Sequence, residues 1–210
     1  MPDISNWLAF GLVALGMALT PGPNMVYLIS RSICQGAAAG LVSLGGVALG
    51  FVVYMVCTAL GITVLFLAVP YAYDALRIGG AIYLLYLAWQ AVKPGARSPF
   101  HVRDLPQDSN PRLFVMGFLT SLFNPKIAVI YLSLLPQFIS LEHGNVLAQS
   151  LTLGFTQIAV SLSVNALVAV TAGTIAGFFA GRPAWLVIQR WLMGTVLAGL
   201  AMRMAMEARR

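Results

Sequence analysis

Charged side chains are scarce in this sequence, since Asp, Glu, Lys and Arg make up only 9% of its 210 residues. A soluble domain carries about a quarter of its residues as charges, and about 20 apolar residues are enough to cross a bilayer. With 60% hydrophobic residues and a mean hydropathy of +0.87, the chain is predicted to be an all-α integral membrane protein. Several long stretches contain no charge at all: residues 4–30, 32–73, 78–92, 143–181 and 191–202.

Cysteine and histidine are nearly missing as well. The cysteines, Cys34 and Cys57, have no CxxC spacing, and the histidines, His101 and His143, fall in expected loops. We therefore predict no disulfide, no metal site and no cofactor. The sequence also contains no HExxH, GxSxG or phosphate-binding GxxxxGK[ST] motif, which argues against an enzyme and against a self-contained ATP-driven pump.

The hydrophobic stretches that are present predict about six transmembrane helices. A polar loop at 93–112 divides the single transmembrane domain, 1–210, into a first half of about 1–92 and a second half of about 113–210. The expected helices cover residues 4–30, 38–67, 71–92, 113–139, 146–179 and 184–206.

The two halves resemble each other. Each begins with a helix that proline interrupts, at Pro21 and Pro23 in the first half and at Pro125 in the second, and each continues with a helix rich in small residues. Because each half has three helices, the second half enters the membrane from the opposite face. The sequence therefore predicts two inverted three-helix repeats whose broken helices, the first and the fourth, meet near the middle of the bilayer, as in secondary transporters.

The distribution of basic residues predicts the orientation. Six helices place both termini on one side of the membrane and the loop at 93–112 on the other. Because the side with more Lys and Arg faces the cytoplasm, we expect the loop inside and both termini outside. Bases at these places also account for the net charge of +6 without a nucleic-acid partner. The count is seven against four: Arg31, Lys93, Arg97, Arg103, Arg112, Arg182 and Arg190 against Arg77, Arg203, Arg209 and Arg210.

One charge, Lys126, lies far from the others. It follows Arg112 by 14 residues and precedes Glu142 by 16, so its Cα is roughly 20 Å from either charge along a helix. A lysine at membrane depth costs about 2.5–3.5 kcal/mol on insertion scales and normally faces a polar cavity or a partner. We expect Lys126 to bind a substrate carboxylate, whereas a shortened or re-entrant helix would place it among the lipid headgroups.

The proline breaks and one polar helix face supply the other candidates. Proline frees carbonyl groups of the preceding turn, which a membrane tolerates only where protein or water satisfies them, although the prolines of the first helix also fit a simple kink. In the fifth helix Gln157, Ser161 and Asn165 share a face at i, i+4 and i+8, so they either line a cavity or bind a neighbouring helix. The predicted substrate-binding residues are Pro21, Gly22, Pro23, Asn24, Asn124, Pro125, Lys126, Gln157, Ser161 and Asn165.

In combination, five segments that span the chain resemble the LysE/RhtB superfamily of small bacterial inner-membrane exporters. The resemblance implies export of an amino acid or a close analogue, driven by the membrane potential or a proton gradient. The segments are Pro21-Gly22-Pro23-Asn24, the glycine-rich start of the second helix, Gly80-Ala81-x-Tyr83-Leu84-x-Tyr86-Leu87, Asn124-Pro125-Lys126 and Leu135-Pro136-Gln137-Phe138.

The sequence departs from many of these relatives at Ser161, where they carry a carboxylate, and no acid lies deep in any expected helix. We therefore expect a neutral substrate such as threonine, homoserine or leucine rather than lysine. We also expect Lys126 to act as a fixed charged binding group and not as a proton carrier. A passive channel or a structural membrane protein is the alternative to an exporter, and the sequence leaves a homo-oligomer open.

Overall fold

The computed structural model describes residues 2–68, 72–93, 106–140, 145–180 and 183–206. Within these residues the chain is helical apart from short connections, and the described part contains no strand. The prediction of an all-α chain is confirmed, and helices lie in all six predicted segments. They are α1 (Ile4–Leu19), α2 (Pro23–Gln35), α3 (Ala37–Ala68), α4 (Ala72–Val92), α5 (Asn110–Leu122), α6 (Pro125–Val129), α7 (Val146–Ala180) and α8 (Pro183–Met206).

Two helices are long and apolar enough to cross a membrane, at Ala37–Gly61 in α3 and Val146–Thr174 in α7. Two bent pairs meet the same criterion when each pair is taken as one span. The α1–α2 pair bends by 51°, and α5 with the segment Pro125–Phe138 bends by 48°. The described residues therefore contain up to four spans by length and composition, together with a shorter apolar helix at Ile78–Gln90 in α4.

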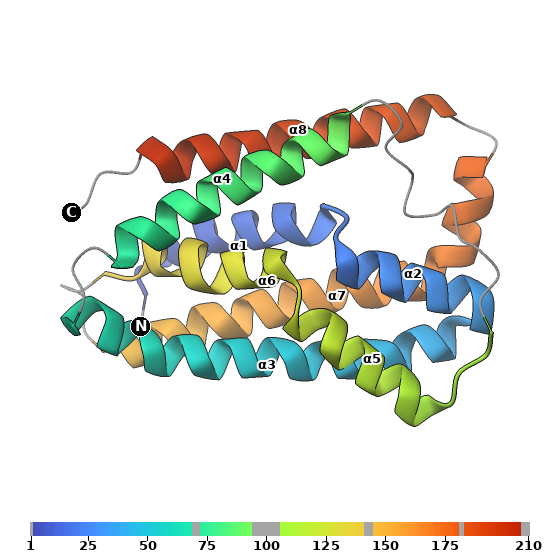
Figure 1. Cartoon of the computed structure of the whole chain (residues 1–210), viewed down its shortest axis with the longest axis horizontal. Coiled ribbons are helices and arrows are strands. Elements are labelled where there is room, and N and C mark those ends of the chain that lie inside the picture. The colour runs from blue at the N-terminus through green and yellow to red at the C-terminus, as the bar shows by residue number, and fades with distance from the viewer. Residues whose placement is uncertain (1, 69–71, 94–105, 141–144, 181–182, 207–210) are drawn as a thin grey trace.

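The helices lie roughly along one long axis (Figure 1). Helix α5 slopes across α3 toward one edge of the bundle, whereas α1, α2 and α6 lie in its middle. Helices α3 and α7 pack against each other on one side of them, and α3 also packs along α5. Helices α4 and α8 pair on the other side, where α4 covers the region after α6. The start of α1 and the end of α8 lie at the same end of the bundle.

Proline and glycine end α1 and start α2. The chain is extended at Thr20 (ψ 121°) and again at Gly22, the residue before α2. Pro23 is the first residue of α2, where a helix has no use for an amide donor. The predicted break in the first helix is thus a true interruption of the helix.

The second break is similar but carries a side-chain cap. Helix α5 ends at Leu122, and Pro125 opens α6. The Oδ1 atom of Asn124 accepts a hydrogen bond of 3.0 Å from the backbone amide of Lys126 and so caps the new helix. After Val129 the helix widens into a π-helical turn (Ile130–Leu134) and then tightens into a 3₁₀ turn (Leu135–Phe138) that contains Pro136.

Small residues let the backbones of α3 and α5 touch. A Cβ atom added to Gly46 would collide with the carbonyl of Phe114, and one added to Gly117 would collide with the carbonyl of Ser43. One turn further, a Cβ on Gly50 would lie 2.6 Å from the Cβ of Ser121. The Gly46-x-x-x-Gly50 spacing thus brings α3 against the end of α5, next to the second break.

The expected polar loop at 93–112 is wrong at its C-terminal end, because α5 begins at Asn110 with Ser109 before it. Residues 94–105 lie outside the described residues. Asp108 is held by α2: its carboxylate lies 2.7 Å from Arg31 Nη1, and Gln35 bonds both its amide nitrogen and its carbonyl oxygen. The start of α5 is therefore tied to the end of α2.

Candidate functional site

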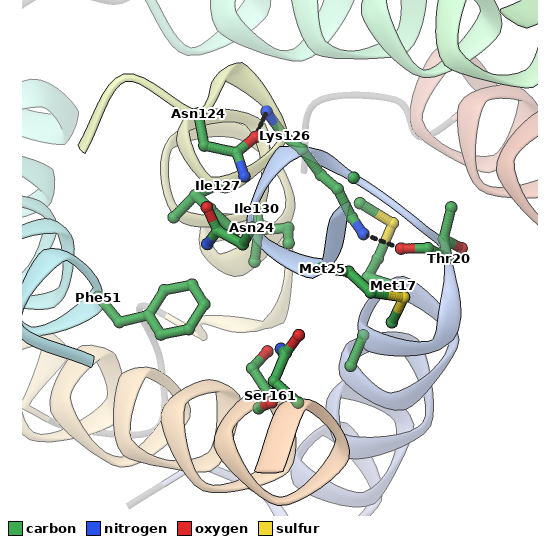
Figure 2. Close-up of a pocket in the computed structure, with 13 residues that line it drawn as sticks. Met17, Thr20, Asn24, Met25, Phe51, Asn124, Lys126, Ile127, Ile130 and Ser161 are labelled. Atoms are coloured by element: carbon green, nitrogen blue, oxygen red, sulfur yellow. Dashed lines mark hydrogen bonds between the residues drawn. The ribbon is translucent and has the colours of Figure 1, made fainter. Parts of the chain in front are cut away.

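The two helix breaks lie side by side and contact each other reciprocally. The Nζ atom of Lys126, the second residue of α6, donates a hydrogen bond to the backbone carbonyl of Thr20 at the end of α1 (Figure 2). Asn24, the second residue of α2, donates from Nδ2 to the hydroxyl of Ser121 near the end of α5, at 3.4 Å. Each second half-helix thus reaches the end of the other pair's first half-helix.

Both breaks free a carbonyl group that an unbroken helix would satisfy. Thr20 would normally accept from the amide of Asn24, and Leu122 from that of Lys126, because helical bonds join residues four apart. In the structure Lys126 Nζ satisfies Thr20, and the hydroxyl of Tyr54 in α3 satisfies Leu122 at 2.8 Å. Each freed carbonyl thus receives a side-chain donor from a different helix.

The ammonium group of Lys126 lies inside the protein, since only 6% of the residue is exposed. Its hydrogen-bond acceptor is the neutral carbonyl of Thr20 at the C-terminal end of α1, where the helix dipole favours a cation. Gly22 makes room for the side chain, because a Cβ there would lie 3.0 Å from Cδ and 3.5 Å from Nζ of Lys126. This burial supports a protein-lined site for Lys126, and the alternative of a re-entrant helix stays a prediction, because the bent pair fits a broken span as well as a re-entrant loop.

A small cavity adjoins the ammonium group. It offers about 20 Å³ to the centres of water-sized molecules, which is room for one or two waters and too little for an amino acid. None of its lining side chains is a carboxylate, and Lys126 is the charged one. The lining residues are Met17, Ala18, Thr20, Gly22, Asn24, Met25, Phe51, Asn124, Lys126, Ile127, Ile130, Ser161 and Asn165.

Several buried amide groups beside the cavity keep an unused oxygen. Asn165 donates from Nδ2 to the carbonyl of Ser161 at 2.8 Å, and Gln157 donates from Nε2 to the hydroxyl of Ser161 at 2.7 Å. The Oδ1 atoms of Asn24 and Asn165 and the Oε1 atom of Gln157 are buried and have no hydrogen-bond partner. The cavity therefore combines one cation with acceptors that are ready for donors.

The structure brings six of the ten predicted site residues to the cavity wall: Gly22, Asn24, Asn124, Lys126, Ser161 and Asn165. Gln157 lies one turn away and contacts the cavity through Ser161. The three prolines, Pro21, Pro23 and Pro125, are not among the lining residues; Pro23 and Pro125 are exposed, and all three shape the breaks.

Sequence reasoning missed Thr20 and the apolar part of the wall. Thr20 contributes a main-chain carbonyl, which its position directly before Pro21 could have signalled. Met17, Phe51 and Ile130 give no such signal, because they are apolar residues in apolar helices. The described residues contain no group of three or more His, Cys, Asp or Glu that could hold a metal ion, and His101 and His143 lie outside the described part.

Comparison with known proteins identifies relatives over nearly the whole chain. The chain is 31% identical to the homoserine/homoserine lactone efflux protein of Salmonella typhimurium over 175 residues. The aligned region covers 83% of this chain and 84% of that protein. The same values hold for the protein of that name from Salmonella typhi. This chain is also 24% identical to the leucine efflux protein of Klebsiella pneumoniae over 202 residues, which are 96% of this chain and 95% of the Klebsiella protein. No solved structure matches.

The LysE type translocator family matches residues 15–208, a range that contains both helix breaks and the cavity. The resemblance read from the sequence segments is thereby confirmed. This chain is a membrane protein that belongs to the LysE translocator family.

Proposed function

We propose that this protein is a secondary transporter that exports neutral amino acids from the cytoplasm across the bacterial inner membrane. The observation that carries the proposal is the buried ammonium group of Lys126, whose partner is the neutral carbonyl of Thr20. A buried cation without a counter-ion is costly, so an incoming carboxylate would be bound strongly. The α-carboxylate of an amino acid supplies that group.

The charge of the cavity supports a neutral amino acid over a basic one. A zwitterion adds no net charge to a site that already holds one cation. Lysine or arginine would bring a second cation into a wall that has no carboxylate to balance it. The named relatives fit this view, because homoserine and leucine both have uncharged side chains.

The size of the cavity supports a transporter that changes shape. With room for only one or two waters, the cavity of the described conformation is too small for an amino acid. Entry of an amino acid requires the half-helices to separate and Lys126 to exchange the Thr20 carbonyl for the substrate carboxylate. The reciprocal contacts Lys126–Thr20 and Asn24–Ser121 support two inverted repeats as the bodies that move.

The test is amino-acid efflux from cells loaded with dipeptides and from vesicles that contain the purified protein. Lys126→Met removes the cation while keeping most of the side-chain volume, and we expect efflux to fall to background. Lys93→Met, outside the cavity at the end of α4, is the control and should retain efflux. Normal efflux by Lys126→Met, or faster efflux of lysine than of homoserine, threonine and leucine, would contradict the proposal.

The alternative, a passive channel, differs in one measurable respect. A transporter coupled to the membrane potential or to a proton gradient moves amino acid out of an energised vesicle against a concentration gradient, and a channel only equalises the two concentrations. We expect accumulation against the gradient. Equalisation alone, with or without the membrane potential, would favour the channel.

A further inference from the structure

The cavity contains a second set of groups that the carboxylate site does not use. Asn24 in α2 and Asn165 in α7 both line it, and each is only 5% exposed. The Oδ1 atom of each has no hydrogen-bond partner. A buried acceptor without a partner is unfavourable unless water or a ligand supplies a donor, so two such acceptors in one cavity indicate a ligand with several donors.

The side-chain nitrogens of Asn24 and Asn165 already donate hydrogen bonds, and these bonds fix the orientation of the side-chain oxygens. Asn24 Nδ2 donates to Ser121, and Asn165 Nδ2 donates to the carbonyl of Ser161. Each side chain is thus held from its nitrogen and leaves its oxygen free. Figure 2 shows Asn24 beside Ile127 and Ile130 on one wall of the cavity and Ser161 of α7 on the wall below.

We propose that the oxygens of Asn24 and Asn165 bind the α-ammonium group of the substrate and thereby make a free amino group a requirement for export. This inference rests on the proposed function. An ammonium group has three N–H donors. Two meet Asn24 and Asn165, and the third meets the Thr20 carbonyl once Lys126 has left it for the substrate carboxylate.

The use of neutral acceptors suits a transporter. Amide and carbonyl oxygens bind an ammonium group through dipoles, without a full negative charge that would pair with Lys126 in the empty site. A carboxylate at either asparagine position would compete with the substrate for Lys126. The zwitterion is therefore recognised at both ends while the site itself keeps a single charge.

The experiment compares an amino acid with its α-hydroxy analogue, for which leucine and 2-hydroxy-4-methylpentanoate are a suitable pair. The analogue keeps the carboxylate and side chain but replaces the ammonium group by a hydroxyl. Affinities are measured by calorimetry on the purified protein and by competition in the vesicle efflux assay. Wild-type protein should bind leucine at least about tenfold more tightly, because hydrogen bonds to a charged group are strong.

Asn24→Leu and Asn165→Leu should lower leucine affinity more than that of the hydroxy acid, so the affinity ratio falls toward one. A purely structural defect would weaken both ligands equally. Ser163→Leu is the matched control, because Ser163 is exposed on α7 and bonds only within its own helix. This control should retain the wild-type ratio.

Two results would overturn the inference: equal affinity of wild-type protein for both ligands, or an unchanged ratio in both asparagine variants. The wild-type comparison decides the matter even where a variant does not fold. Failure of the proposed function looks different, since wild-type protein would then export neither homoserine, threonine nor leucine.

Discussion

Lys126 can reach the end of α1 because the residue beside it has no side chain. Gly22 is extended, with φ −148° and ψ −179°, a conformation that any residue can adopt. Its glycine is therefore explained by space and not by backbone strain: a Cβ would lie 3.0 Å from Lys126 Cδ. Gly22 in the first break therefore leaves space for the side chain of Lys126 in the second break.

Gly22→Val should displace Lys126 from the Thr20 carbonyl. The branched side chain would crowd Cδ and Nζ of Lys126 and move the ammonium group away from the position where it meets the substrate carboxylate. Loss of one charge-assisted hydrogen bond to the substrate corresponds to roughly a tenfold effect. We expect efflux to fall by about that factor while the protein still inserts and folds. Gly11→Val in α1 is the control, since a Cβ there meets no atom within 4 Å; equal efflux by both variants would show that Gly22 does not position the lysine.

At this scale the sequence predicts polar site residues better than apolar ones. Lys126 is identifiable because it is an isolated charge in an apolar stretch, and the i, i+4, i+8 spacing identifies the face that contains Ser161 and Asn165. Phe51 and Met17 line the same cavity, yet each is one apolar residue among many in its helix. Their roles depend on which helices meet, and local sequence does not contain that information.

Among the elements, the helix breaks are predictable and the contacts between them are not. Pro23 and Pro125 mark where α2 and α6 start, because proline is unfavourable within a helix and acceptable in its first turn. Pro111 shows the limit of this reasoning, because it falls within the predicted loop at 93–112 and yet lies in the first turn of α5. The pairing of Arg31 with Asp108 joins residues 77 positions apart, which no local pattern reveals.

The pairing of Arg31 with Asp108 should contribute to stability. Both side chains are nearly buried, with 7% and 6% exposed, and removing one partner of a buried pair typically costs about 3–5 kcal/mol. We expect Asp108→Asn to lower the thermal unfolding temperature of the purified protein clearly. An unchanged unfolding temperature would mean that the pair does not hold α2 against α5.

Arg112 provides the matched control for this prediction. It also contacts Asp108, at 3.0 Å, but 70% of its side chain is exposed. Exposed pairs contribute about 0–1 kcal/mol because water screens them. Arg112→Met should therefore change the unfolding temperature little.

At the scale of the whole molecule, helices of each half pack against helices of the other half. Helix α3 of the first half packs along α5 of the second, and α7 of the second half packs along α1 and α2 of the first. The side-chain contacts at the breaks repeat this exchange, with Lys126 on Thr20 and Asn24 near Ser121. Such reciprocity is what two similar units facing each other across a local axis would produce, and it supports the proposed inverted repeats.

The same arrangement makes the orientation testable. The start of α1 and the end of α8 share one end of the bundle, which suits an even number of crossings (Figure 1). The ends of α2 and α4 and the start of α5, with Arg31, Lys93 and Arg112, lie at the other end. From the positive-inside rule we expect the basic end to face the cytoplasm and both termini to face outward.

Reporter fusions distinguish this orientation from its reverse. Alkaline phosphatase is active only outside the cytoplasm, and green fluorescent protein fluoresces efficiently only when it folds inside. We expect phosphatase activity from a fusion at the C-terminus and fluorescence from a fusion within 94–105. The positive-inside rule counts Lys and Arg rather than net charge. We therefore expect Asp108→Asn, which removes the ion-pair partner of Arg31, to leave the orientation unchanged. A fluorescent C-terminal fusion together with an inactive phosphatase fusion at the same end would show the reverse orientation and contradict this prediction.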